Sequence, residues 1–288
     1  MTKMTYSKKY LINYCTKLLK KEKIKNPRYE SILILSQILK KSFLEIFYND
    51  SIELNKKEIK KYLRRIYQRK LLKPISRING KREFYSRNFF ISKHVLDPRP
   101  ESETLVAVAK RIITNSSKKS LKILELGVGS GCLIISVFLE SKNKSLTGLG
   151  VDISDGAINL AKKNLNKYDL ADSLEIKKSN WFSNVEKKFD LIISNPPYLD
   201  SEEINFLDDE VKKYDPLISL DGGKNGLECY NNISKDIWKY LNVDGIVCLE
   251  IGFNQSKALQ SIFEKQGLVK VLTKKDLLNK DRVIVFKK

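Results

Sequence analysis

Hydrophobic residues recur at helical spacing through the first 75 residues of the chain. One apolar stripe covers 6–19, a second covers 32–39 and continues into further apolar residues, and a third covers 55–72. Asn55 and Glu58 stand three residues apart, the spacing of a capping box at the start of a helix. The pattern therefore predicts three helices that pack as a small all-α bundle.

The hydrophobic pattern changes between residues 76 and 100, where short aromatic and β-branched runs such as REFYSRNFFIS replace the helical stripes. Runs of this kind are typical of a hairpin or an extended segment. We therefore expect a helical domain over 1–75, a hairpin linker over 76–100 and a second domain over 101–288.

Apolar strands and helices alternate through the rest of the chain. We expect strands at 121–126, 146–152, 173–178, 189–194, 245–251, 268–273 and 281–287. Helices are expected at 103–113, 131–139, 155–168, 228–241 and 255–266. This alternation predicts an α/β fold with a doubly wound, mostly parallel sheet, in which ligands bind at the carboxyl ends of the strands. The segment between the last two strands is too short for a crossover helix, so these strands should pair antiparallel.

The hydrophobic runs are all short. A membrane span needs about 18–20 consecutive apolar residues, and no run in the sequence approaches that length. The first ten residues, MTKMTYSKKY, contain lysines but no apolar signal-peptide core behind them. We therefore expect a cytoplasmic protein that makes no contact with a membrane.

Cysteine and histidine are scarce. The four cysteines lie far apart without a C-x-x-C spacing, and His94 is the single histidine. These numbers exclude a Cys/His zinc site and argue against a disulfide framework. We expect no metal, and we expect His94 to be a packing or loop residue rather than a catalytic base.

Positive charge is concentrated at the front of the chain. The formal net charge is +20, of which residues 1–90 carry +17, from 24 Lys+Arg and 7 Asp+Glu. A basic domain of this kind attracts an acidic partner, such as RNA, the ribosome or an acidic protein. A general lysine bias is the alternative explanation, although such a bias should not spare the last two thirds of the chain.

A glycine-rich turn follows the first strand of the predicted sheet, in the segment Glu125-Leu-Gly-Val-Gly-Ser-Gly131. Glycines allow a tight turn and let a ligand lie against bare backbone at a helix N-terminus. The G-x-G-x-G spacing and the preceding Glu125 favour S-adenosylmethionine over a nicotinamide dinucleotide. A carboxylate there can hold a water or the ammonium group of a methionine moiety, whereas it repels a pyrophosphate.

Asp152 ends the second strand of the predicted sheet, 21 residues after Gly131. A carboxylate at this position can accept hydrogen bonds from both hydroxyls of a ribose. The alternative role for Asp152 is to cap the helix that follows.

The most specific motif, Asn195-Pro-Pro-Tyr198, follows the fourth strand. An NH₂ group on an sp² carbon is a poor nucleophile, and no side chain can deprotonate it first. Two hydrogen-bond acceptors can orient this nitrogen toward a methyl group and take up positive charge as the new bond forms. The Asn195 side-chain oxygen and the Pro196 carbonyl can serve as these acceptors, and Tyr198 offers a flat face to the planar group.

These motifs together resemble the class I S-adenosylmethionine-dependent methyltransferases that act on amino groups. The segments REFYSRNFFIS, Asp97-Pro-Arg-Pro-Glu-Ser-Glu103 and YDPLISLDGGKNGLECY are similar to the peptide chain release factor glutamine methyltransferases of the PrmC/HemK family. The resemblance covers nearly the whole chain and implies a seven-stranded sheet behind a helical substrate-recognition domain. It also implies methylation of the glutamine side-chain amide in the Gly-Gly-Gln loop of class I release factors, with S-adenosylhomocysteine as the second product.

The resemblance further implies roles for single residues. The catalytic residues would be Asn195, Pro196 and Tyr198. The cofactor would be bound by Glu125, Gly127, Val128, Gly129, Ser130, Gly131, Asp152, Trp181 and Asn195. The substrate glutamine would be held by Asn195, Pro196, Pro197 and Tyr198, with Arg99 and Glu101 at the mouth of the site. Two positions depart from the family pattern, because Asn180 stands where Asp is frequent and Val128 where Thr is common.

Several functions remain open at this stage. The expected partner is a class I release factor, the expected state is a monomer, and no nucleic acid is expected as a direct substrate. The alternatives are a glutamine methyltransferase for a ribosomal protein, an adenine-specific nucleic-acid methyltransferase and a non-catalytic binding scaffold. An adenine methyltransferase would have to extrude its base, and no obvious sequence-reading module is present. The long connection over 199–227 is expected to be a lid over the substrate glutamine.

Overall fold

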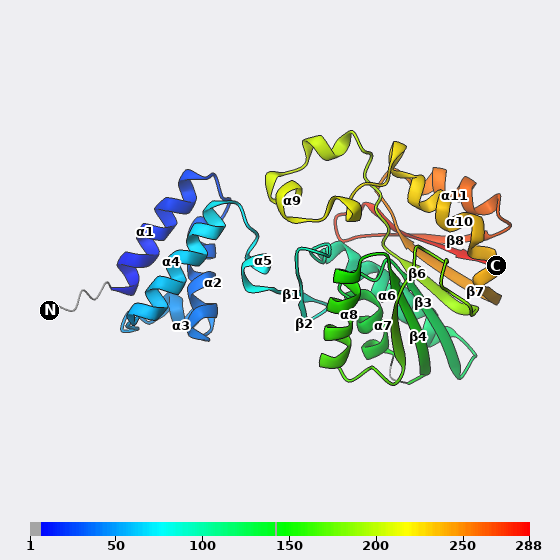
Figure 1. Ribbon diagram of the computed structural model, residues 1–288, viewed down its shortest axis with the longest axis horizontal. Coiled ribbons are helices and arrows are strands. Elements are labelled where there is room, and N and C mark those ends of the chain that lie inside the picture. Colours follow the sequence, from blue (N-terminus) through cyan, green and yellow to red (C-terminus); the bar gives the residue numbers. More distant parts are fainter. Residues whose placement is uncertain (1–6, 142) are drawn as a thin grey trace. The chain divides into compact units, whose positions relative to one another are not determined.

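The chain divides into two compact units, which Figure 1 shows in the computed structural model. The structure describes residues 7–141 and 143–288. The first unit ends at Asn79 and the second covers Gly80–Lys288. Tyr6, where the first apolar stripe begins, lies outside the described residues.

The described part of the first unit consists of helices around an apolar core. These helices are α1 (Lys8–Lys21), α2 (Pro27–Leu39), α3 (Phe43–Tyr48), α4 (Lys56–Lys70) and α5 (Ile75–Asn79). The predicted capping box is confirmed, because Asn55 Oδ1 accepts hydrogen bonds from the backbone N–H groups of Lys57 and Glu58, and Glu58 Oε2 accepts one from Asn55 N. The core includes Cys15, Ile34, Leu35 and Tyr62, all fully buried.

The expectation of three helices was wrong in number, because the second apolar stripe forms two helices. Lys40 adopts a left-handed conformation with φ of 55° and ends α2. Ser42 and Glu45 then form a second capping box that starts α3 as a separate helix. The short helix α5 was not predicted.

A β-hairpin opens the second unit. Strands β1 (Lys81–Phe84) and β2 (Arg87–Phe90) pair antiparallel, and Tyr85 and Ser86 make the two-residue turn with φ of 49° and 58°. The Asn164 side chain accepts a hydrogen bond from Phe90 N and donates one to Phe90 O. These contacts tie the hairpin to the body of the second unit, in which the structure places residues 80–100.

A seven-stranded sheet forms the centre of the second unit, with the strand order β5-β4-β3-β6-β7-β9-β8. The strands are β3 (Ser120–Leu126), β4 (Ser145–Asp152), β5 (Leu174–Lys178), β6 (Phe189–Ser194), β7 (Leu241–Glu250), β8 (Val269–Lys275) and β9 (Asp281–Lys287). Strands β5, β4, β3, β6 and β7 are parallel, while β9 runs antiparallel to both β7 and β8. The predicted doubly wound, mostly parallel α/β sheet of seven strands and its antiparallel last pair are therefore confirmed.

Helices cover both faces of this sheet, as the ribbon in Figure 1 shows. One face packs against α6 (Glu103–Asn115), α7 (Cys132–Glu140) and α8 (Asp155–Lys167). The other face packs against α10 (Glu228–Tyr240) and α11 (Ser256–Glu264). Alternate residues of each strand enter the two cores, so Ile123 faces the first group of helices and Leu124 the second.

Strand β7 begins earlier than predicted. The segment Asn242-Val-Asp-Gly245 has the composition of a turn, but it continues the strand directly from α10. An irregularity in the pairing of β6 with β7 absorbs these residues, and Asp244 adopts a φ of 60°. The strand-end position of Glu250, which matters for the site, is unaffected.

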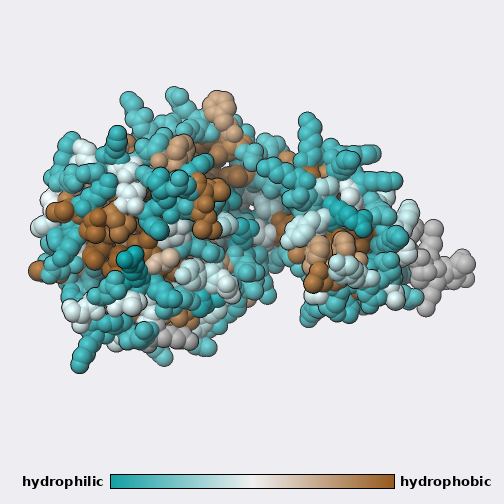
Figure 2. Space-filling view, turned by 180° about the vertical axis from the view of Figure 1, so that it is seen from behind, coloured by the Kyte–Doolittle hydropathy of each residue, from teal (hydrophilic) through white to brown (hydrophobic). Residues whose placement is uncertain are grey.

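The surface of each unit is mainly hydrophilic, with separate apolar patches (Figure 2). Exposed apolar side chains of the second unit include Phe206, Val243 and Leu277. Within residues 7–141 and 143–288, no helix is long and apolar enough to cross a membrane.

Candidate active site

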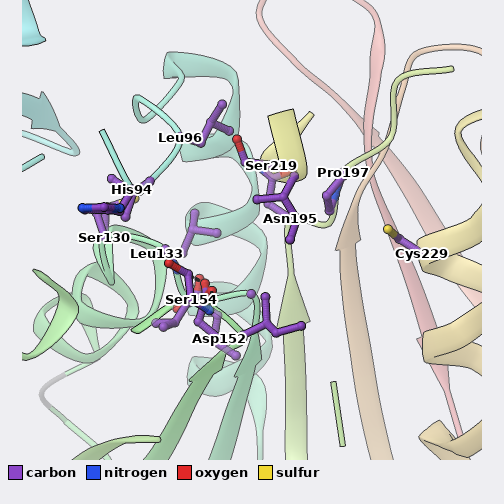
Figure 3. Close-up of a pocket in the computed structure, with 18 of the residues that line it drawn as sticks. His94, Leu96, Ser130, Leu133, Asp152, Ser154, Asn195, Pro197, Ser219 and Cys229 are labelled. Carbon is purple, nitrogen blue, oxygen red and sulfur yellow. Dashed lines mark hydrogen bonds between the residues drawn. The ribbon is translucent and has the colours of Figure 1, made fainter. Parts of the chain in front are cut away.

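A cavity of about 290 Å³ opens at the carboxyl ends of β3, β4 and β6. In Figure 3, Asp152 and Ser154 lie on one side of this pocket, and Asn195 and Pro197 lie on the other. The predicted residues that line it are Arg99, Glu125, Gly127, Val128, Gly129, Ser130, Asp152, Trp181, Asn195 and Pro197. The structure does not place Glu101, Gly131, Pro196 or Tyr198 on its wall.

The glycine-rich turn gives the pocket a wall of bare backbone. Gly127 and Gly129 have φ of 71° and 52°, and a Cβ built on either residue would meet nothing within 4 Å. Gly131 has a different task, since its φ of 79° starts α7 and a Cβ there would lie 3.0 Å from Ile135 Cδ1. Two glycines therefore leave room for a ligand, and the third lets the helix begin.

Asp152 holds the glycine-rich turn from the end of β4. Its Oδ2 accepts a hydrogen bond from Gly129 N at 2.9 Å, and its Oδ1 accepts one from Ser154 N at 2.9 Å. Burial raises the pKa of this carboxyl, while the backbone hydrogen bonds oppose the rise. The helix cap of α8 is Ser154, whose hydroxyl accepts from Ala157 N. The alternative role of Asp152 as the N-cap is therefore wrong.

Glu125 lies at the base of the pocket and is 1% exposed. Its Oε2 accepts a hydrogen bond from Ile134 N, in the first turn of α7, at 3.0 Å. Burial raises the pKa of this carboxyl well above its ordinary range, and the nearby charge of Asp152 adds to the rise. One oxygen of Glu125 is thus committed to the helix, which fixes the direction in which the carboxyl faces the cavity.

Asn195 presents its carboxamide to the pocket directly after β6. Its Nδ2 donates a hydrogen bond to Ser102 Oγ at 3.2 Å. Within the described part of the chain, no hydrogen bond to Asn195 Oδ1 is present. The amide oxygen is therefore available as the acceptor that the N-P-P-Y motif predicts.

Tyr198, the last residue of the motif, forms hydrogen bonds with two residues from distant segments of the chain. Its hydroxyl accepts a hydrogen bond from Arg282 Nη1 at 3.3 Å, and its carbonyl accepts one from Gln255 Nε2 at 2.9 Å. Burial raises the pKa of the Tyr198 hydroxyl to about 12. Gln255 also donates to Gly226 O at 3.2 Å, so one amide joins the motif to the segment that follows it.

The long connection after the motif contributes to the pocket wall through Ile218, Ser219 and Asp221. It contains the 3₁₀ turns η2 (Glu203–Phe206), η3 (Leu217–Ser219) and η4 (Lys224–Gly226) and the helix α9 (Asp209–Tyr214). Asp215 anchors it, because its Oδ2 lies 2.7 Å from Arg99 Nη2 and its Oδ1 accepts from Asp97 N at 3.2 Å. Arg99, which lines the cavity, therefore also holds this segment.

Two loops contribute further residues to the wall. Trp181 has a φ of 49° and lies beside Asn180, which also lines the cavity. His94 lines the pocket from the segment after the hairpin and packs closely on Gly156, where a Cβ would lie 2.4 Å from the imidazole Cγ. His94 is thus a loop residue with a packing contact, as predicted.

Sequence reasoning missed four residues in or beside the site: Ser102, Asp215, Glu250 and Gln255. Glu250 is 1% exposed at the end of β7, and burial raises the pKa of its carboxyl to about 7. A charged residue inside the apolar run GIVCLEI was a visible signal. The other three form hydrogen bonds and an ion pair across long sequence separations, which the sequence alone does not reveal.

Two family models and several known proteins match this chain in sequence. The family model "Methyltransferase small domain" matches residues 100–209, and the model "PrmC N-terminal domain" matches residues 11–80. A release factor glutamine methyltransferase of Clostridium botulinum is 37% identical over 274 residues, which cover 94% of this chain and 95% of that protein. One from Agrobacterium fabrum is 33% identical over 267 residues, or 92% of each chain.

Longer relatives also match. A bifunctional methyltransferase of Rickettsia conorii is 36% identical over 306 residues that cover 98% of this chain, and the chain spans only 58% of that protein's length.

Among solved structures, the hMettl16 catalytic domain in complex with the MAT2A 3'UTR hairpin 6 has a TM-score of 0.56 at 16% identity. That match covers 83% of this chain and 84% of the other, and it supports the fold.

Proposed function

Because the chain belongs to the family of release factor glutamine methyltransferases, we propose that it methylates the side-chain amide of the glutamine in the Gly-Gly-Gln loop of class I release factors. The observation that carries this proposal is the Asn195 carboxamide, which lines the cavity with its oxygen available as an acceptor. The ribose-type carboxylate of Asp152 lines the same cavity. The methyl donor is S-adenosylmethionine, and S-adenosylhomocysteine leaves as the second product.

The residues of the pocket fit this donor. Bare backbone at Gly127 and Gly129 leaves space for a ligand, and Asp152 retains lone pairs for two ribose hydroxyls beyond those used by Gly129 and Ser154. Trp181 and Asn180 line the wall where an adenine would lie. When bound, the sulfonium of the donor supplies an electrophilic methyl group.

Asn195 orients the acceptor nitrogen. An amide nitrogen has its lone pair delocalised, so its two N–H groups must be held while the lone pair turns toward the methyl carbon. Asn195 Oδ1 accepts from one N–H. The motif assigns the other N–H to the Pro196 carbonyl, although Pro196 is not among the residues that line the cavity. A carbon–nitrogen bond forms as the carbon–sulfur bond breaks, and one amide proton then leaves to solvent. The two acceptors stabilise the positive charge that develops on nitrogen.

The helical unit serves to recognise the protein substrate. Residues 1–90 carry +17 of the formal net charge of +20, and the helices contain no constellation of side chains able to perform chemistry. Long-range attraction raises the association rate with an acidic partner and is screened by salt. We assign the recognition role to residues 1–75 and the catalytic role to residues 101–288, in a protein that acts as a monomer.

Mass spectrometry tests the proposal. Release factor incubated with the protein and S-adenosylmethionine should gain one methyl group on the peptide that contains the Gly-Gly-Gln loop, and fragmentation should locate it on the glutamine side chain. A methyl group on another residue, or on a ribosomal protein in place of the release factor, would contradict the proposed substrate.

A further inference from the structure

Glu250 is a buried carboxyl group that the proposed chemistry leaves without a task. It ends β7, next to the end of β6, since Ser194 pairs with Leu249. Its Oε2 is buried and has no hydrogen-bond partner among residues 7–141 and 143–288. Burying a carboxyl in this way is costly unless neighbouring groups compensate. A residue of this kind, beside the end of the strand that leads into Asn195, calls for a functional explanation.

Ser102 connects this carboxyl to Asn195. Its hydroxyl oxygen accepts the hydrogen bond from Asn195 Nδ2 at 3.2 Å. Hydrogen bonding by the Ser102 side chain also lowers the pKa of Glu250, and that of Asn195 does so more weakly. Ser102 is 3% exposed, so its hydroxyl has little access to water as an alternative partner. The buried side chains of Ser102 and Glu250 and the partly exposed side chain of Asn195 therefore form one polar group beside the pocket.

We propose that Glu250 is a positioning residue that sets the orientation of the Asn195 carboxamide through Ser102. This inference rests on the proposed function, in which Asn195 Oδ1 must face the acceptor amide. An ionised carboxylate only accepts hydrogen bonds, so it draws the hydroxyl hydrogen of Ser102 toward itself. Ser102 Oγ must then accept from Asn195, which turns Nδ2 inward and Oδ1 toward the substrate.

The reverse arrangement would oppose methyl transfer. If Ser102 donated to Asn195, the carboxamide would turn its oxygen inward and present its NH₂ group to the pocket. Each NH₂ group can only donate, so the NH₂ groups of Asn195 and of the substrate amide cannot form a hydrogen bond with each other. The substrate amide would therefore lose one of its two partners. The ionised form of Glu250 excludes this arrangement, whereas a protonated Glu250 permits it.

Turnover should therefore depend on whether the Glu250 carboxyl is ionised. Burial raises its pKa to about 7, while Ser102 and the positive charge of Arg282 oppose the rise and the negative charge of Glu101 adds to it. Three other groups sense the charge of Glu250. Burial raises the pKa of Tyr198 and that of Cys132 to about 12, and it raises the pKa of Tyr230 well above its ordinary value. These three stay protonated near neutral pH.

The sign of the pH effect follows from the role of the ionised form. As pH falls through the raised pKa of Glu250, the carboxyl takes a proton and becomes able to donate to Ser102. The constraint on Asn195 is then lost, so kcat should fall on the acid side of about pH 7. Replacement by glutamine, which can donate at every pH, should lower kcat by about tenfold and remove this inflection.

A substrate-independent measurement tests the orientation directly. The full chain is labelled with ¹⁵N-asparagine and studied by NMR. The side-chain NH₂ signals of Asn195 are identified by their loss in Asn195→Ser. These signals are then followed across the neutral pH range. They should titrate with a midpoint near the pKa of Glu250 in the wild type and stay constant in Glu250→Gln. Signals that do not titrate in the wild type, or that titrate equally in Glu250→Gln, would overturn the inference even if the proposed substrate were wrong.

Kinetics with release factor supply the second test. Ser102→Ala and Glu250→Gln should each lower kcat by about tenfold with KM for the donor unchanged, and the double variant should lose no more than either single one. Glu140→Gln changes a carboxylate paired with Arg87 and Lys110 outside the pocket and is the matched control. Independent losses that multiply in the double variant, or a change in KM alone, would refute the coupling. A wild type without turnover on release factor would count against the proposed function, and the NMR titration would still decide the role of Glu250.

Discussion

Asp152 offers the sharpest test of the cofactor site, because its two oxygens each accept one backbone hydrogen bond and face the cavity. Asp152→Ala removes the acceptors for the ribose hydroxyls and also leaves Gly129 N and Ser154 N without their partner. A hydrogen bond to a charged group contributes about 1.5–3 kcal/mol. Because the glycine-rich turn can recover part of this through water, we expect a loss of about 1–3 kcal/mol in donor binding, or about 5- to 150-fold in Kd.

Isothermal titration calorimetry with S-adenosylmethionine measures this loss. Asp155→Ala is the matched control, since Asp155 lies three residues further on in the first turn of α8 and pairs with Lys178 at the exposed surface. Its Kd should stay within about twofold of the wild type, because exposed ion pairs contribute little. Equal losses in both variants, or unchanged affinity in Asp152→Ala, would refute the role assigned to Asp152.

The affinity of the wild type should also depend on pH. Burial raises the pKa of Asp152 above its ordinary value, so the carboxylate takes up its proton at a higher pH than a free aspartate does. Because the ionised form accepts from the ribose, the Kd for the donor should rise as pH falls through that raised pKa. Calorimetry in a series of acidic buffers should show this rise in the wild type and its absence in Asp152→Ala.

Three further predictions follow from the site and the charge distribution. Asn195→Ala should lower single-turnover methyl transfer by on the order of 10²-fold with donor affinity within a few fold, and a near wild-type rate would show that the motif is only structural here. Asp215→Asn, which weakens the pair with Arg99, should raise KM for release factor several-fold in steady-state assays, and an unchanged KM would remove the lid role of 199–227. Reversing four exposed charges of α4 should raise KM for intact release factor and make this KM less dependent on salt. KM for a Gly-Gly-Gln peptide should stay unchanged, and equal effects on both substrates would refute recognition by the helical unit. These four residues are Lys57, Lys60, Lys61 and Arg64.

The sheet could be predicted because burial imposes a pattern on the sequence. Strands buried on both faces are mainly apolar, so runs such as LKILEL and FDLIIS identify β3 and β6 to within one residue. The glycine-rich turn, Asp152 and Asn195 lie at strand ends, and parallel strands bring such ends to one edge. Most of the pocket wall therefore follows from local sequence.

The hydrogen bonds that hold the site residues in place could not be predicted, because they join segments that lie far apart in the sequence. Gln255 joins the Tyr198 carbonyl to Gly226, and Ser102 meets Asn195 across 93 positions. Tyr198 was expected to face the substrate, but its hydroxyl accepts from Arg282, which lies 84 positions further along the chain. Hydrogen bonds of this kind leave no periodic pattern in the sequence.

The central claim is that the pocket methylates a glutamine amide of a release factor, and transfer of a labelled methyl group tests it most directly. S-adenosylmethionine carrying a radiolabelled methyl group is incubated with the protein and, side by side, with class I release factor, the same factor with the loop glutamine replaced by alanine, ribosomal proteins and DNA. The label should enter the release factor alone and disappear when the loop glutamine is replaced. Label in ribosomal proteins or DNA, or label retained by the alanine variant of the factor, would contradict the account.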